Sequence, residues 1–339
     1  MAGRASARNP YYQGPVSDHF DGTRFFNPDG VEPGGFADVL KWQFGGGRAR
    51  WPKVRDNPVG RVKPARSVDG EDLRVTMIGH ASLLIQISGL NILTDPVWSE
   101  RCSPLSFAGP KRVMRPGVAL EDLPPIHFVI VTHNHYDHMD MVTLKALQRA
   151  HAPRFITPLG NDQIIHKAIP EAHISVMDWG DRLEFNGVLT IDAEPSHHWS
   201  ARGPGDRRMA LWAAFVLRTP AGSIYHVGDT GFHQGINYRD AGRKHGGFRL
   251  AILPVGAYEP RWFMRGQHQN PEEAVEGMKL CHAAHAVGHH FGTFQLTNEA
   301  IDAPVEDLMA ALDQAGVPRH RFRALLPGEA FDVPVAPAT

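Results

Sequence analysis

The sequence predicts an α/β sandwich, in which two β-sheets pack face to face and helices cover their outer faces. Three observations indicate this class. Short apolar runs typical of strands recur from residue 73 to residue 254. Helical patterns are interspersed among them, as expected when helices pack on the outside of sheets. The 339 residues, 42% hydrophobic and 21% charged, suffice for a sizeable core.

Each element is indicated by a local pattern. The apolar runs predict strands, and Ser88-Gly89 between the second and third of them is a hairpin turn signal. Two of the three predicted helices have a proline near their start, where its missing N–H costs nothing. The strands are expected at 73–78, 82–87, 90–93, 127–132, 154–157, 174–177, 188–193, 211–218, 223–227, 250–254 and 286–288, and the helices at 141–150, 271–284 and 305–315.

The N-terminal segment differs from the rest. Residues 1–70 are rich in glycine, proline and arginine, and the prolines predict an irregular extension packed on a domain formed by residues 71–339. Within it, residues 41–66 hold eight lysines and arginines against one acid, Asp56, with aromatic residues between them. This stretch is either a solvated extension anchored by its aromatic side chains or a patch that contacts anionic phosphates or a membrane surface.

Composition argues against several classes of protein. The sequence contains no run of 18 apolar residues, so no transmembrane helix is expected, and residues 1–10 lack the apolar core of a secretory signal. Cys102 and Cys281 cannot form a disulfide framework, which indicates a reduced, cytoplasmic protein. The formal net charge of −1 does not indicate a nucleic-acid partner.

The stretch that carries most chemical information is Thr132-His133-Asn134-His135-Tyr136-Asp137-His138, at the end of a predicted buried strand. Side chains two residues apart in an extended chain point the same way, so His133 and His135 can share one metal ion. Asp137 and His138 lie about one turn further on and can reach a second ion. A polar loop with surface histidines is the alternative, and this spacing makes it improbable.

Three further stretches follow predicted strands and offer additional ligands: His197-His198, Asp229 in Gly228-Asp229-Thr230-Gly231, and His289-His290. Alone, each is weak, because paired histidines are often on the surface and an aspartate in such a turn is often a turn former. Their shared position at the ends of successive apolar runs is the argument, since loops on a rigid scaffold are where sites are built.

The series His-x-His-x-Asp-His, His, Asp, His resembles the metallo-β-lactamase superfamily. The order of the motifs between about residues 70 and 300 is similar to that of its N-acyl-phosphatidylethanolamine phospholipase D family. This resemblance implies an αββα sandwich of two mixed sheets with a dinuclear zinc site at its edge, and a hydrolase domain at 71–339. The motifs are Gly79-His80-Ala81, Leu93-Thr94-Asp95-Pro96, Gly109-Pro110-Lys111-Arg112, His133-Asn134-His135-Tyr136-Asp137-His138, His198-Trp199, Gly228-Asp229-Thr230-Gly231, Pro271-Glu272-Glu273-Ala274 and His290-Phe291-Gly292-Thr293-Phe294.

The resemblance also implies which residues hold the metals. His133, His135 and His198 would hold one zinc, and Asp137, His138 and His290 the other, with Asp229 bridging the two. Asp95 is expected to orient a ligand histidine or its loop. His268 is the first candidate for protonating the leaving group, although it is equally compatible with a place beside a helix start. Nitrogen and oxygen ligands also suit iron and manganese, so either could replace one zinc.

The implied reaction is hydrolysis of N-acyl-phosphatidylethanolamine-like lipids, a phospholipase D type phosphodiester cleavage, in which a metal-bridging hydroxide attacks phosphorus. A lactonase or other carbonyl hydrolase on the same dinuclear site is the alternative, and a non-catalytic metal-binding scaffold is a third. The expected partners are a phospholipid-like or other small substrate and a peripheral membrane contact through 41–66. The oligomeric state is left between a monomer and a homodimer.

Overall fold

A computed structural model of the chain describes residues 8–335. The first seven residues, part of the stretch in which no secretory signal is expected, and residues 336–339 of the predicted hydrolase domain lie outside the described residues. Within the described part, no helix combines the length and the apolar character that a membrane span requires.

The first of two sheets is formed mainly by the N-terminal half of the chain, joined at one edge by the last strand. Its pairing is antiparallel from β14 to β3 and parallel from β3 to β6, so the sheet is mixed. Its strands, in spatial order, are β14 (Ala330–Asp332), β1 (Leu73–Gly79), β2 (Ser82–Ile87), β3 (Leu90–Thr94), β4 (Phe128–Ile130), β5 (Arg154–Pro158) and β6 (His173–Met177).

The second sheet is also mixed, and its strands come from the C-terminal half of the chain. Its pairing is antiparallel from β7 to β10 and parallel from β10 to β13. Its strands, in spatial order, are β13 (Phe322–Ala324), β12 (Ala283–His289), β11 (Phe248–Pro254), β10 (Gly222–His226), β9 (Ala214–Thr219), β8 (Leu189–Glu194) and β7 (Arg182–Phe185).

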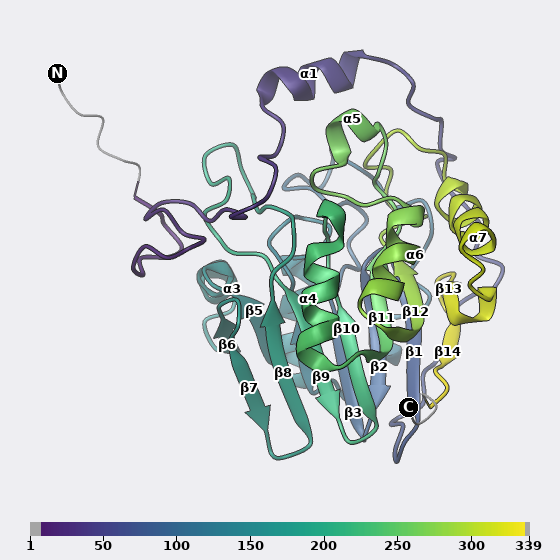
Figure 1. Cartoon of the computed structure of the whole chain (residues 1–339). Helices are drawn as coiled ribbons and strands as arrows, with labels where there is room; N and C mark the ends of the chain where they lie inside the picture. The colour runs from purple at the N-terminus through teal and green to yellow at the C-terminus, as the bar shows by residue number, and fades with distance from the viewer. Residues whose placement is uncertain (1–7, 336–339) are drawn as a thin grey trace.

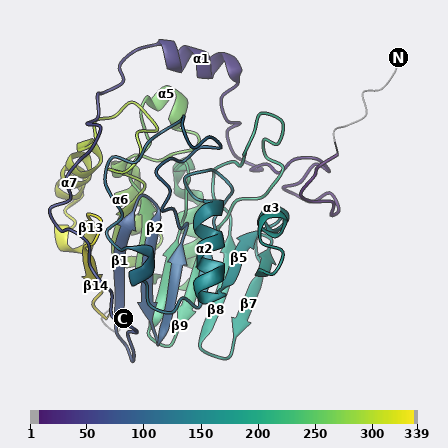
Figure 2. The same cartoon turned by 180° about the vertical axis from the view of Figure 1, so that it is seen from behind.

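The helices cover the two outer faces. The second sheet is covered by α4 (Ile236–His245), α6 (Pro271–Leu280) and α7 (Ala303–Ala315), which lie in front of it in Figure 1. Seen from behind, α2 (Met141–His151) and α3 (Asn161–Ala168) lie on the first sheet (Figure 2). One apolar cluster fills the space between the sheets, and a separate cluster lies under each helical layer. The predicted αββα sandwich of two mixed sheets is therefore confirmed.

The segment before β1 contains a helix that the sequence analysis did not predict. Helix α1 (Phe36–Phe44) spans nine residues, and Gly45 is its C-cap. The prolines that indicated an irregular segment leave a gap between Pro33 and Pro52, which is long enough for this short helix. Figures 1 and 2 both show α1 beside the short helix α5 (Arg261–Met264), at the end of the molecule opposite the β7–β8 hairpin.

Candidate metal centre

The central loop of the site runs from the end of β4 to the start of α2, and hydrogen bonds fix it at both ends. At its start, the backbone N–H and the hydroxyl of Thr132 each donate to Asp95, at 2.8 Å. At its end, Asp140 caps α2 by accepting from the backbone N–H of Val142 at 3.1 Å and from the hydroxyl of Thr143 at 2.6 Å. The loop between these anchors carries the four ligand-type residues that the sequence pattern singled out.

Three histidines form the first group. Nδ1 of His135 lies 2.9 Å from Nε2 of His133 and 3.2 Å from Nε2 of His198. Nitrogens bound to one tetrahedral zinc at about 2.0–2.1 Å are about 3.3 Å apart, so this spacing fits a shared ion. His198 comes from the loop after β8, so strands of both sheets supply the group.

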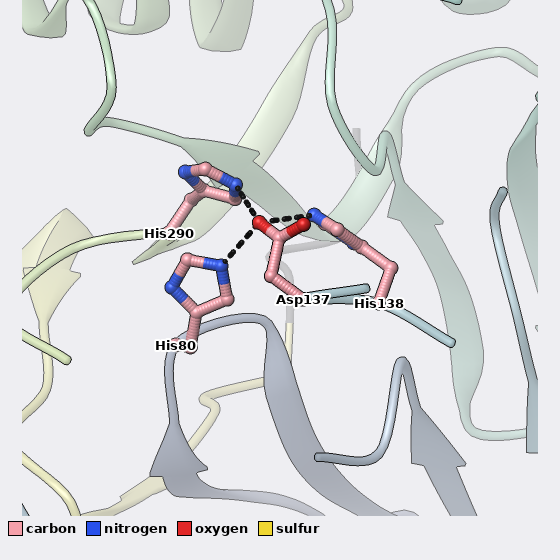
Figure 3. Close-up of side chains that lie close together, drawn as sticks. All are labelled: His80, Asp137, His138 and His290. Carbon is pink, nitrogen blue, oxygen red and sulfur yellow. Dashed lines mark hydrogen bonds and ion pairs between the residues drawn. The ribbon is translucent and has the colours of Figure 1, made fainter. Parts of the chain in front are cut away.

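A second group surrounds Asp137 (Figure 3). Its Oδ2 lies 3.1 Å from Nε2 of His290, 3.5 Å from Nε2 of His138 and 2.8 Å from Nε2 of His80. His138 and His290 are fully buried, and His290 follows the last residue of β12. The four ligand atoms lie within 4.8 Å of one another, close enough to surround one ion.

Asp229 lies between the two groups. Its Oδ2 is 3.1 Å from Nε2 of both His138 and His290, and 3.8 Å from Nε2 of His198. The preceding Gly228 has a φ of +65°, and a Cβ there would lie 2.9 Å from the Thr132 side chain. Glycine is therefore required for the turn that brings Asp229 to this position. Asp229 therefore approaches histidines of both groups.

Asp95 lies behind the ligands, at the end of β3. Its Oδ2 accepts from Nδ1 of His138 at 2.8 Å, which leaves Nε2 of that imidazole facing Asp229. The same carboxylate binds Thr132 at the start of the central loop. Asp95 thus contacts both a candidate ligand histidine and the loop that carries it.

The neighbouring histidines are oriented differently. His197 places its Nδ1 2.9 Å from the Asn237 side chain, away from the two groups. His289 is fully buried beside His226, with 5.6 Å between the ring centroids, and belongs to no metal-competent group of the described residues. The geometry therefore favours His198 and His290, as the motif positions had indicated.

His268 lies at the edge of the centre. Its ring centroid is 5.0 Å from that of His198 and 5.4 Å from that of His290, and a ligand atom of each of His198, Asp229 and His268 lies within one 4.8 Å group. Burial lowers the pKa of His268 well below its usual value. At neutral pH the imidazole is therefore neutral, so it can offer an N–H to a hydrogen-bond acceptor but cannot act as a charged acid.

The pKa values of the three histidines in the first group favour metal binding. Burial lowers the pKa of His135 to about 3 and that of His198 to about 4, and burial also holds the pKa of His133 well below its usual value. These imidazoles are neutral at pH 7 and keep the lone pairs that ligation requires.

In the second ligand group, around Asp137, a histidine pKa is raised rather than lowered. Burial alone would lower the pKa of His290, but the carboxylates of Asp229 and Asp137 outweigh it and raise the value to about 9. Asp137 and Asp229 themselves have pKa values well below the usual range, because the cationic side chain of His138 outweighs their burial. A metal ion bound by this group would take the place of the protons that the two carboxylates hold on His138 and His290.

The donor set fits a divalent metal. Oδ1 of Asp229 and Nε2 of His135 are buried without a hydrogen-bond partner among residues 8–335. Buried polar groups ordinarily have partners, so the unpaired oxygen of a carboxylate that faces His138, His198 and His290 indicates that something outside the chain completes it. Imidazole and carboxylate donors suit zinc, iron or manganese.

A cavity of about 530 Å³ adjoins this centre. His135, Gln267 and His268 lie on the side facing the metal centre, and most of the remaining wall is apolar or aromatic. The N-terminal segment supplies part of that wall through Pro33, Gly34, Val39 and Trp42. The sequence analysis did not predict this contribution, because α1 itself was not expected.

The chain belongs to the beta-lactamase superfamily: the family model described as "Beta-lactamase superfamily domain" matches residues 90–291. More particularly, it is similar to N-acyl-phosphatidylethanolamine-hydrolyzing phospholipase D 1 of Caenorhabditis elegans, with 37% identity over 265 residues, 74% of either chain. The mitochondrial N-acyl-phosphatidylethanolamine-hydrolyzing phospholipase D of Saccharomyces cerevisiae is 31% identical over 245 residues, 71% of this chain and 52% of the yeast protein.

Solved structures agree on the fold. The isothiocyanate hydrolase from Delia radicum gut bacteria superposes with a TM-score of 0.60 at 22% identity, over 76% of this chain and 98% of that one. The predicted resemblance to the metallo-β-lactamase superfamily and to its N-acyl-phosphatidylethanolamine phospholipase D family is thus confirmed. The chain is a member of a family of metal-dependent hydrolases.

Proposed function

We propose that the protein is a dinuclear zinc phosphodiesterase of the phospholipase D type that hydrolyses N-acyl-phosphatidylethanolamine-like lipids. The observation that carries this proposal is the pair of largely buried ligand groups joined through Asp229 and adjoining an apolar cavity. The similarity to two N-acyl-phosphatidylethanolamine-hydrolysing relatives supports this choice of substrate.

In this proposal, His133, His135 and His198 would hold one metal ion, Asp137, His138 and His290 would hold the other, and Asp229 would be shared between them. When bound, the two ions supply an acidified water and neutralise charge that develops on the phosphoryl oxygens. Asp95 keeps Nε2 of His138 directed at the centre by accepting from its Nδ1. No serine or cysteine nucleophile is required, and both cysteines are buried with raised pKa values caused by that burial.

The lining of the cavity favours a substrate that carries an apolar group near the bond to be cleaved. Trp42, Trp199 and Phe263 line it together with aliphatic side chains, and such a surface stabilises an acyl chain by removing it from water. Arg207 is the charged side chain in the lining and offers a cation to an anionic phosphate. His268 faces the same cavity, where its neutral imidazole can donate to a phosphoryl or leaving-group oxygen.

We further propose that α1 and α5 contact a membrane surface. Phe44 is 85% exposed and Trp262 is 53% exposed, and Nζ of Lys41 lies 4.6 Å from the centroid of the Trp262 ring. Exposed aromatic side chains flanked by cations are typical of interfacial helices. The proposed contact involves only part of the basic stretch 41–66. Arg55 pairs with Asp302 and Lys63 pairs with Asp122 on the domain, so these two cations are already engaged.

The substrate proposal is tested by adding zinc-loaded protein to N-acyl-phosphatidylethanolamine and to bis(p-nitrophenyl) phosphate, with product analysis. We expect release of N-acylethanolamine and phosphatidic acid together with diester cleavage. Cleavage of lactones or esters without diester hydrolysis would overturn the phosphodiesterase and favour the carbonyl hydrolase. Loss of both activities with both metals bound would favour a non-catalytic scaffold.

The membrane proposal is tested by sedimentation with vesicles that contain anionic phosphatidylglycerol. Replacement of Phe44 by serine together with Lys41 by glutamine is expected to weaken binding, and added salt should weaken the binding of the unchanged protein. Val188→Ser is the control, because this exposed valine lies next to β8 on the hairpin at the opposite end of the molecule (Figure 1). Equal binding by both variants would contradict the membrane contact.

A further inference from the structure

His80 lies in the tight turn between β1 and β2, where it joins the first sheet to the loop that carries His290. Its backbone N–H donates to the hydroxyl of Thr293 at 2.9 Å, and its carbonyl accepts from the backbone N–H of His290 at 3.0 Å. Its φ of +58° is in the left-handed region, which a residue other than glycine adopts only where its surroundings fix it. The backbone of His80 is therefore strongly determined, which fixes the point from which its side chain extends.

The ring of His80 is directed at Asp137 (Figure 3). Nε2 lies 2.8 Å from Oδ2 of that carboxylate, and His80 is 2% exposed. An ionised carboxylate only accepts hydrogen bonds, so Nε2 carries the proton and donates it. The other ring nitrogen, Nδ1, is buried without a hydrogen-bond partner among the described residues.

His80 differs from the two neighbouring histidines in what it contacts. His138 and His290 each lie within 3.5 Å of a carboxylate oxygen of both Asp137 and Asp229. His80 has an ion pair with Asp137 but none with Asp229 within residues 8–335. His80 therefore contacts this ligand group through Asp137 alone, whereas His138 and His290 lie between both carboxylates and can share an ion with them.

We propose that His80 is a positioning residue, which holds the Asp137 carboxylate by donating from Nε2 and so fixes the metal ion on the Asp137–His138–His290 side. A carboxylate on a flexible Cα–Cβ bond has two soft torsions, and one strong hydrogen bond removes much of that freedom. Partners of this kind affect metal affinity by about 10- to 100-fold. The inference rests on the proposed metal centre and adds a residue to which the proposed function assigns no role.

The test compares two substitutions that differ in where they place a donor. In His80→Gln, the side-chain amide nitrogen can occupy the place of Nε2 and donate to Asp137. In His80→Asn, the amide is too short to reach, although asparagine tolerates the left-handed backbone. The control is His285→Asn, which replaces a buried histidine that packs on Phe331 with 5.9 Å between ring centroids. Zinc affinity is measured by chelator competition, and the melting temperature of each metal-free protein is measured in parallel.

We expect the unchanged protein, His285→Asn and His80→Gln to keep two zinc ions with similar affinities. We expect His80→Asn to bind one zinc normally and the other at least tenfold more weakly, with a metal-free melting temperature close to that of His285→Asn. Normal binding of both ions by His80→Asn, or weak binding by both His80 variants, would overturn the positioning role alone. If the unchanged protein binds no zinc, the metal centre fails as well, which distinguishes the two cases.

Discussion

The strand-end loops of the metal centre and the N-terminal segment, residues 8–70, are held to the same sandwich by different means. The ligand residues are buried except His135 and Asp137, which are partly exposed, and each contacts at least one other titratable side chain of the centre. The N-terminal segment is held by a small apolar cluster, in which Phe20 and Phe25 pack with Leu211 and Trp212, and by single hydrogen bonds such as that from the indole of Trp42 to Asn298. We therefore expect the hydrolytic reaction to depend on the loops, and the N-terminal segment to affect which substrates reach the metal centre.

The largest effect is expected when Asp229, the carboxylate that joins the two ligand groups, is replaced by a neutral amide. Asp229→Asn should remove at least one metal ion and reduce kcat by about a thousandfold or more, since several kcal/mol of transition-state stabilisation depend on the pair. Metal content and diester hydrolysis are measured on one preparation. The control is Asp192→Asn, a buried aspartate of β8 that pairs with Arg182 and Arg218. Normal metal content and turnover in Asp229→Asn would remove this residue from the centre.

A smaller effect on metal affinity is expected from Asp95, which contacts a ligand histidine but is not itself a ligand in this proposal. Asp95→Asn loses the charge that orients His138 and anchors Thr132, so metal affinity should fall by about 10- to 100-fold. Chelator competition measures this change, with Asp192→Asn again as the buried control. An affinity within threefold of the unchanged protein would show that the loop holds His138 without Asp95.

The next prediction concerns the N-terminal segment. Trp42→Ala removes part of the cavity wall, and loss of about 1–2 kcal/mol of apolar contact should reduce kcat/KM for the lipid by roughly tenfold. Hydrolysis of bis(p-nitrophenyl) phosphate, which has no acyl chain, should change little. Trp51→Ala is the matched control, because Trp51 belongs to the same segment but does not line the cavity. Equal losses on both substrates would mean that Trp42 supports the metal centre instead.

The smallest effect is a pH dependence of the contact between the segment and the domain. Nε2 of His19 lies 2.7 Å from Asp178, and its ring stacks on Trp179 with 4.6 Å between centroids. Burial lowers the pKa of His19, but the hydrogen bonds to Asp178 and Asp18 outweigh it and raise the pKa above 6.5. A raised pKa means that the contact stabilises fully below about pH 6.5 and is lost as pH rises through the higher folded value.

Amide hydrogen exchange of residues 11–26 measures this effect, after correction for the intrinsic pH dependence of exchange. Protection should fall with rising pH in the unchanged protein. In His19→Gln, protection should be lower at acidic pH and nearly independent of pH. A pH dependence that persists in His19→Gln would assign it to another group.

Much of the fold could be predicted from the sequence, because apolar alternation and runs determine buried strands. The strand expected at 82–87 has the observed bounds of β2. Helix α4 was not expected, because in a largely polar segment only Tyr238, Ala241 and Gly242 are buried. The predicted helix 271–284 is too long, because the chain leaves α6 at Leu280, and β12 begins at Ala283.

The candidate ligands were predictable because ligand-type residues follow strands whose ends meet at one edge. The contact between His80 and Asp137 was not, because it joins residues 57 positions apart through a turn and a loop. The cavity wall could not be predicted either, since the basic and aromatic pattern of residues 41–66 did not indicate where the segment packs. Such contacts depend on tertiary packing, which local sequence patterns do not encode.

The most direct test of the central claim is the metal content of the purified protein, measured by mass spectrometry after dialysis. The two ligand groups predict two metal ions per chain in the unchanged protein and no more than one in Asp229→Asn. One ion or none in the unchanged protein, or two in the variant, would contradict a dinuclear centre joined by Asp229.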